Sequence, residues 1–151
     1  MAHGSSSRYS CPLTLQLIGP HSWTDVPAVL AYRADDPFTV RITFGDTGAG
    51  RDADGGVVWL VGRELLQAGL HRPAGDGDVR VWPAAATTDV LFLHLRAPSG
   101  EALFELSRAT LTAFLRETEA LVPTGTEATV LDMDDELAAL LSNGGADPMG
   151  R

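Results

Sequence analysis

The side chains in this sequence that could do chemistry include three cationic ones, with two carboxylates near them in the sequence. His71, Arg72 and Arg80 could form a small pocket that holds an anion. The alternative is structural, with these side chains pairing with carboxylates or holding a turn. Asp76 and Asp78 could suggest a metal site, but no glutamate follows at the last ligand position of a calcium-binding loop. We therefore expect an ordinary turn at these two aspartates.

A larger acidic cluster lies nearer the end of the sequence, at Asp132, Asp134, Asp135 and Glu136. Capping of a helix and a solvated helix face account for this cluster better than a metal site does. We expect neither a metal nor a cofactor in this protein.

Nucleophilic catalysis has little support in the sequence. There is no G-x-S-x-G motif and no phosphate-binding P-loop. Cys11 stands beside Pro12 with no identifiable partner base. His94, near the end of an apolar stretch, is typical of a histidine whose hydrogen bonds are satisfied structurally. We predict that the protein is not an enzyme; a small hydrolase, the alternative, would need a polar pocket joining His71 or His94 to a carboxylate.

Three tryptophans, Trp23, Trp59 and Trp82, are expected to pack in the core, whereas an exposed tryptophan would indicate a partner surface. Trp82 alternates with Arg80, and we expect one of them inside and the other outside or at an interface. The candidate residues for partner binding or an interface are therefore His71, Arg72, Arg80 and Trp82.

The composition favours one globular domain that works without nucleic acid. The chain has 151 residues, a net charge of −9 and 11 positive residues, all of them arginine. A nucleic-acid-binding protein normally presents a basic field, so nucleic acid is an unfavoured partner. No apolar stretch approaches the roughly 20 residues of a membrane helix, and the N-terminus lacks an apolar signal core. With a single cysteine, these features predict a cytoplasmic protein without a membrane span.

The first half of the sequence predicts four strands and a short helix. Apolar alternation or an apolar run marks strands over 13–17, 26–33, 38–44 and 57–61, and Phe38, Val40, Ile42 and Phe44 give the clearest period of two. Gly45–Gly56 is rich in Gly and Asp and should be a mobile loop. Leu65, Leu66 and Leu70 form the stripe of a short helix, which we expect to end at Gly69 in a positive-φ conformation before Pro73.

The second half predicts three more strands and two helices. The strands cover 79–82, 90–95 and 102–106, with a turn at Pro98-Ser99-Gly100. A helix should then run from a Ser107 cap to Pro123, and a last helix should start at an Asp132 cap and end at Gly144. We expect a flexible tail over 1–10, one domain over 11–143 and a flexible tail over 144–151. This order, ββββ-α-βββ-αα, predicts an α+β fold with antiparallel sheets.

Four segments carry a resemblance to a known family. The run Gly69–Pro83 reads G-L-H-R-P-x-G-x-G-D-V-R-V-W-P and resembles the signature of the SsgA-like sporulation and cell-division regulators of filamentous actinomycetes. Asp36–Arg41 resembles the D-P-Y-x-V-R segment of that family, and Gly100–Glu105 resembles its G-x-A-L-x-E. Phe114–Glu127 resembles its F-L-x-x-T-x-x-x-V-P-x-G-x-E. The match extends from Cys11 to Leu141, with two mild departures at Phe38 (Tyr in the family) and Gly62 (usually Ala).

The resemblance implies a fold and a role. The implied fold is Whirly-like, a single α+β domain whose antiparallel strands and helices share a core and which assembles in rings, often trimers. The implied role is non-enzymatic control of septum placement during sporulation through protein contacts, including help in recruiting the tubulin-like protein FtsZ to division septa. Single-stranded nucleic-acid binding, which the Whirly-like fold serves elsewhere, is the alternative; it would need aromatic platforms beside a positive groove.

Overall fold

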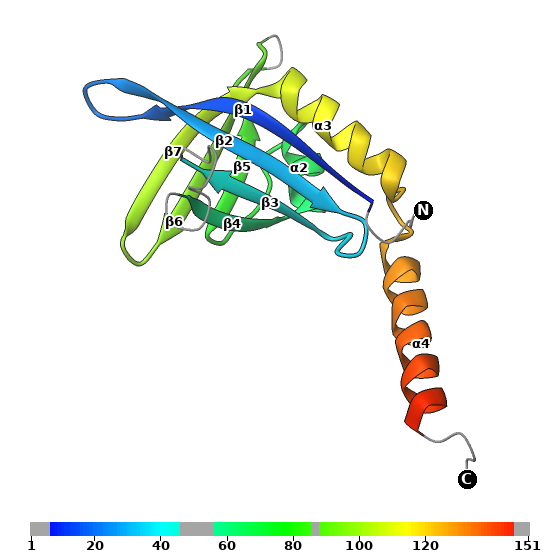
Figure 1. The fold of residues 1–151 in the computed structure, drawn as a ribbon. Helices are drawn as coiled ribbons and strands as arrows, with labels where there is room; N and C mark the ends of the chain where they lie inside the picture. The colour runs from blue at the N-terminus through cyan, green and yellow to red at the C-terminus, as the bar shows by residue number, and fades with distance from the viewer. Residues whose placement is uncertain (1–6, 46–55, 86–87, 147–151) are drawn as a thin grey trace.

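In the described part of the chain, seven strands and three helices follow one another in the order predicted from the sequence (Figure 1). The computed structural model describes residues 7–45, 56–85 and 88–146. Most of the loop predicted over Gly45–Gly56 lies outside the described residues. The elements are β1 (Arg8–Ile18), β2 (Trp23–Arg33), β3 (Thr39–Phe44), β4 (Val57–Gly62), α2 (Arg63–Gly69), β5 (Val79–Pro83), β6 (Val90–Ala97), β7 (Gly100–Ser107), α3 (Arg108–Leu121) and α4 (Glu127–Ala146). Residues 8–10, expected in a tail, form the start of β1.

The strands form one sheet in the order β4-β3-β2-β1-β7-β6-β5, and every pairing is antiparallel. The predicted α+β class with antiparallel strands is therefore confirmed. The sheet curls, and β1 and β2 pair along their full length as a long hairpin (Figure 1). The pairing of β1 with β7 is limited to Gln16 and Leu17, and α3 contacts both strands.

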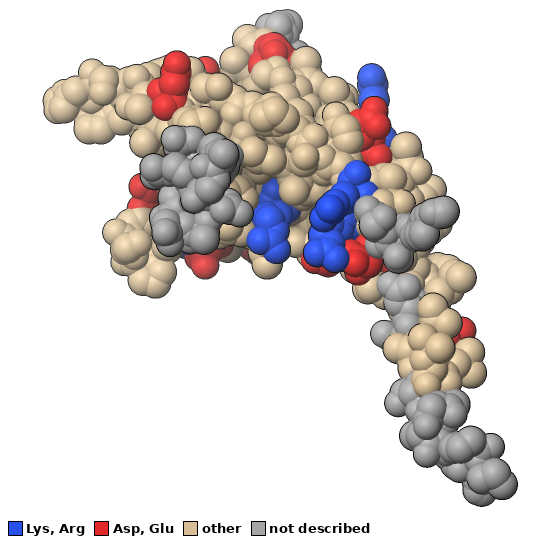
Figure 2. Space-filling view, in the orientation of Figure 1, with Lys and Arg blue, Asp and Glu red and all other residues tan. Residues whose placement is uncertain are grey.

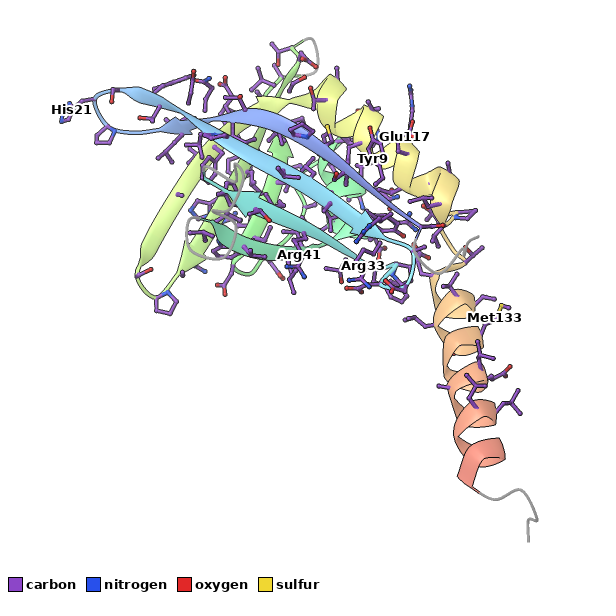
Figure 3. The ribbon with its side chains drawn as sticks, viewed as in Figure 1. Tyr9, His21, Arg33, Arg41, Glu117 and Met133 are labelled. Carbon is purple, nitrogen blue, oxygen red and sulfur yellow. The ribbon has the colours of Figure 1, made fainter. Side chains whose placement is uncertain are left out.

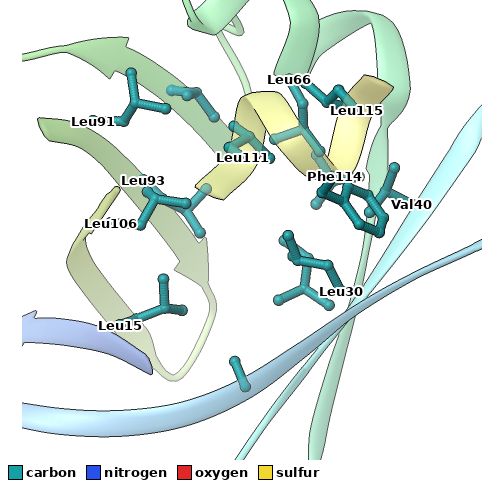
Figure 4. Packing of buried hydrophobic residues seen from close by; sticks show 14 of the residues in the cluster. Leu15, Leu30, Val40, Leu66, Leu91, Leu93, Leu106, Leu111, Phe114 and Leu115 are labelled. Atoms are coloured by element: carbon teal, nitrogen blue, oxygen red, sulfur yellow. The ribbon is translucent and has the colours of Figure 1, made fainter. Parts of the chain in front are cut away.

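The core lies on the concave face of the sheet, under α2 and α3. Alternate strand residues such as Leu30, Val40 and Leu93 point to this face and are at most 2% exposed, which is the period of two expected of half-buried strands. The helices add Leu66 from α2 and Phe114 from α3 (Figure 4). The cluster is continuous from β4 to β5, so all seven strands share one core with α2 and α3.

The cap predicted for α3 is confirmed. The Ser107 hydroxyl accepts a hydrogen bond from the Thr110 amide at 3.1 Å and donates to Asp89 Oδ2 at 2.7 Å. Asp89 Oδ1 in turn accepts from the Ala109 amide at 2.8 Å, so two free amides of the first turn are satisfied. These bonds hold the pKa of Asp89 below its ordinary value. α3 ends before Pro123, as predicted.

Three predictions, one about Gly69 and two about the bounds of the last helix, are wrong. Gly69 ends α2 but does not have positive φ. Its role is to let α2 approach β5 closely, since a Cβ there would lie 2.5 Å from Val81 Cγ1. Positive φ occurs instead at Gly75, at +87°. α4 begins at Glu127 rather than at an Asp132 cap, and it continues through Gly144 to Ala146.

Two aromatic residues expected inside are exposed. Phe38 is 48% exposed because it precedes β3 in the turn that Tyr32 holds by donating to the Pro37 carbonyl. Trp23 is 55% exposed because it lies at the start of β2, beyond the core. Trp59, by contrast, is half-buried and packs against the core, as predicted.

Candidate partner-binding surface

The outer face of β5, β6 and β7 carries the side chains that alternate with the core residues of these strands. In β5, Val81 points to the core, so Arg80 and Trp82 both point outward. The prediction that one of them would lie inside is wrong, because residues two apart in a strand share a face. The register places Arg80 beside His94 and Trp82 beside Phe92. Residues far apart in the sequence therefore meet on one surface.

A groove of about 510 Å³ crosses this outer face. Its lining is Pro73, Ala74, Gly75, Arg80, Trp82, His94, Arg96, Glu101 and Leu103. We call this surface the β5–β7 groove. Its floor comes from three paired strands, and one wall comes from the turn after α2. The backbone of Ala74 pairs with Val81 in both directions, at 2.8 and 3.0 Å, which fixes that wall against β5.

The charge in the groove is mainly positive. Neither Arg80 nor Arg96 forms an ion pair with any carboxylate in the described part of the chain. Glu101 instead bonds His94 Nε2 at 2.6 Å. The other ring nitrogen of His94 is buried and has no partner among the described residues. Two guanidinium groups that form no ion pair within the described residues, in a protein of net charge −9, make this groove suited to an acidic partner.

An aromatic pair borders the charged groups. The ring centroids of Trp82 and Phe92 lie 5.7 Å apart, tilted by 35°, and both side chains are half-buried. Leu103 adds an aliphatic patch to the same groove. A partner that fills the groove could thus bury apolar surface while pairing with the two arginines, which is the composition found at energetically important interface positions.

Of the four residues predicted for partner binding, the structure joins two. Arg80 and Trp82 line the β5–β7 groove, whereas His71 and Arg72 are exposed in the turn before Pro73 and do not line it. Sequence reasoning missed Arg96 as a member of the site and interpreted His94 as purely structural. The available signal was the period-two series Phe92, His94, Arg96, which places all three on one face of β6.

The groove meets one requirement of the hydrolase alternative, but its described lining residues supply no side-chain nucleophile. His94 does meet a carboxylate, Glu101, in a polar pocket, which is the arrangement that the hydrolase alternative required. However, no serine, threonine or cysteine is among the described residues that line the groove. A histidine–carboxylate pair without a nucleophile provides no covalent catalysis.

Two other surface depressions are chemically simpler. One, of about 330 Å³, lies on the outer face of β2 and β3, where Figure 3 labels Arg33 and Arg41 and Figure 2 shows basic side chains. Arg33 is already paired there with Asp35, through bonds of 3.0 and 2.7 Å that lower the pKa of Asp35. The other, of about 600 Å³, is mostly apolar and lies between β4 and the β6–β7 turn.

A buried arginine that sequence reasoning missed fixes where α4 leaves the body. The Arg63 side chain is 1% exposed. Its guanidinium donates to Thr118 O at 3.1 Å, Val122 O at 2.8 Å and Glu127 Oε2 at 2.6 Å. It also lies 5.1 Å from the ring centroid of Tyr32. Arg63 thus joins the start of α2, the end of α3 and the first residue of α4.

Beyond this junction, α4 extends away from the sheet (Figure 1). Its apolar side chains at Met133, Leu137, Leu140 and Leu141 are 55–69% exposed, and Figure 3 shows Met133 on the part of α4 that stands clear of the sheet. The spacing of four, three and one residues places them on one side of the helix. We call this set the α4 stripe. It is a second surface with the composition of a contact site.

Comparison with known proteins defines the class. Residues 26–127 match the SsgA family, described as the Streptomyces sporulation and cell division protein SsgA. This match covers more than half of the chain, so the protein belongs to the SsgA family of sporulation and cell division proteins, and not to a family of enzymes. The resemblance seen in the sequence motifs is confirmed.

Individual relatives match nearly the whole chain. The sporulation-specific cell division protein SsgB of Frankia casuarinae is 45% identical over 134 residues, covering 87% of this chain and 90% of that protein. SsgB of Streptomyces coelicolor is 44% identical over 135 residues, covering 88% and 95%. The crystal structure of an SsgA-like sporulation-specific cell division protein from Thermobifida fusca superposes with a TM-score of 0.79 at 36% identity, over 92% of this chain and 98% of that one. In the described ranges, no helix is both long and apolar enough to cross a membrane.

Proposed function

We propose that this protein controls the placement of sporulation septa through protein contacts, by helping to recruit FtsZ to division sites, and that it works there as a homo-oligomer, a trimer. Its relatives over nearly the full length are sporulation-specific cell division proteins. The observation that carries the proposal is a chain with two exposed contact surfaces, the β5–β7 groove and the α4 stripe, and with no nucleophile among the described groove residues. Such a chain is built to bring proteins together.

The four residues predicted from the sequence belong to this proposal. Arg80 and Trp82 form part of the β5–β7 groove, and His71 and Arg72 are exposed in the adjoining turn. We assign all four to contacts with a partner or a subunit. The site of action is the division septum.

Co-sedimentation with polymerised FtsZ tests the proposal. We expect the protein to pellet with FtsZ polymers, directly or with a second family member present, and to remain in the supernatant when GTP is omitted. A deletion strain should place its sporulation septa irregularly. Absence of any association, direct or assisted, together with normal septation in the deletion strain, would defeat the proposal.

Single-stranded nucleic-acid binding is a second candidate because one observation favours it. Trp82 and Phe92 stand beside Arg80 and Arg96, which is the combination of aromatic and basic groups that stacks and neutralises single strands. Glu101 in the groove and Glu105 on the same face of β7 oppose it. Fluorescence anisotropy with a labelled oligonucleotide at low salt separates the two. We expect no binding, and tight, salt-sensitive binding would favour this second candidate.

A further inference from the structure

The α4 stripe continues a surface that begins on the protein's own core. Val130, one turn before Met133, packs against the core. From Met133 onward the same side of the helix is open, and Leu140 and Leu141 are each 69% exposed. The stripe therefore needs a cover that its own described residues do not supply.

The charge of α4 restricts what can cover the stripe. Between Glu127 and Ala146 the helix has five acidic residues and no basic one. Glu127 is paired with Arg63 inside the protein, but Asp132 and Glu136 are exposed. They are four residues apart and so flank the stripe together on one side. The helix thus presents an apolar line with an acidic margin.

The β5–β7 groove also presents apolar surface, but with basic side chains beside it. Trp82 and Leu103 supply its apolar surface, and Arg80 and Arg96 are free of ion pairs with described carboxylates. The dimensions agree as well. Met133 to Leu141 rises about 12 Å along a helix, at about 1.5 Å per residue, and three paired strands span about 10 Å, at about 4.8 Å per gap.

We propose that α4 of one molecule binds in the β5–β7 groove of a second copy, with the α4 stripe on Trp82 and Leu103 and with Asp132 and Glu136 facing Arg80 and Arg96. This inference rests on the homo-oligomer in the proposed function and assigns its interface. Each copy gives a helix and receives one, so the contact is heterologous and can close into a ring. The Arg63–Glu127 ion pair sets the direction in which α4 extends from each molecule.

A bundle of α4 helices around a common axis is the competing arrangement. It would also bury the stripe, but it would bring several acidic margins together with no basic residue from α4 between them. Like charges at an interface oppose association, whereas the groove offers two positive partners. The charge pattern therefore favours the groove.

Charge reversal on the full chain tests this interface. Sedimentation velocity at micromolar concentration would compare the wild type with R80E/R96E, D132R/E136R and the four-fold combination. We expect each double variant to raise the dissociation constant by at least about tenfold and the combination to recover most of the loss. The matched control is R33E/R41E, which reverses two arginines on the outer face of β2 and β3 and should leave the constant unchanged within about twofold. Circular dichroism would verify that each variant is folded.

The outcomes of this experiment test the interface and the homo-oligomer separately. An oligomeric wild type whose dissociation constant is unchanged in R80E/R96E would overturn the interface and leave the oligomer standing. Double variants that weaken assembly without recovery in the combination would also overturn the pairing. A monomeric wild type would overturn both the homo-oligomer and this interface, while co-sedimentation with FtsZ would still test the recruitment role independently.

Discussion

Replacing Arg63 with methionine should cost a large share of the protein's stability. Methionine keeps an apolar stem in the site but removes the guanidinium that contacts Thr118 O, Val122 O and Glu127. The Glu127 side chain is only 12% exposed, so its charge would remain largely buried with the Gly125 amide as hydrogen-bond donor but without its ion-pair partner. Breaking a buried ion pair in this way costs about 3–5 kcal/mol. Because small domains are stable by about 5–15 kcal/mol, this is a substantial fraction.

Equilibrium unfolding in urea, followed by circular dichroism, measures this loss. The midpoint should fall while the denaturant slope stays constant, since the variant changes stability and not the folded area. The matched control is Arg33→Met, which also removes an arginine from an arginine–aspartate pair, at 59% and 38% exposure. That pair is solvated, so the control should unfold with the wild type within error. A loss below about 1 kcal/mol for Arg63→Met would refute the assignment of Arg63 as the junction of the three helices.

Three further predictions concern a close contact and two titrating groups. Gly69→Ala should destabilise by about 1–3 kcal/mol, because the new Cβ would meet Val81 Cγ1 at 2.5 Å; Gly77→Ala, where a Cβ would meet nothing within 4 Å, is the control, and equal melting temperatures for both variants would contradict the contact. The Arg63 hydrogen bond lowers the pKa of Glu127, so its stabilisation is present above the ordinary value of 4.5 and is lost as pH falls through the lowered one. Unfolding free energies across acidic pH should therefore fall less steeply in Glu127→Gln than in the wild type, and parallel curves would argue against this linkage. Burial raises the pKa of Tyr32 from 10.0 to about 12, so stability should be lost as pH rises from about 10 through about 12. The difference in tyrosinate absorbance between the wild type and Tyr32→Phe should report a transition near the upper value, and a transition near 10 would show that Tyr32 is not shielded.

Much of the fold could be predicted because the strands alternate cleanly. Val40, Ile42 and Phe44 all reach the core, as their period of two requires. The element order and the Ser107 cap follow from the same local rules. The start of α4 could not be read in this way. Glu127 begins the helix by accepting from the Gly125 amide and by pairing with Arg63, which lies 64 residues earlier. Asp132, a good capping residue, is simply an exposed position within the helix.

Only part of the β5–β7 groove could be predicted from the sequence. Arg80 and Trp82 share a face by strand geometry alone, and applying the period of two correctly would have placed them together. Joining them to His94 and Arg96 requires the register of β5 with β6, which depends on non-local pairing. Gly69 presents a similar case. Its place at the end of α2 was predictable, whereas its contact with Val81 depends on how α2 packs on β5.

The most direct test of the account is the position of FtsZ and of septa in sporulating cells of the source organism. The chromosomal gene would be replaced by the wild type, by R80E/R96E or by the control R33E/R41E, with labelled FtsZ and a membrane stain read in the same filaments. We predict regular ladders of FtsZ and septa with the wild type and the control, and irregular or missing ladders with R80E/R96E at equal protein levels. Regular ladders in all three strains, and in a strain that lacks the gene, would contradict the account.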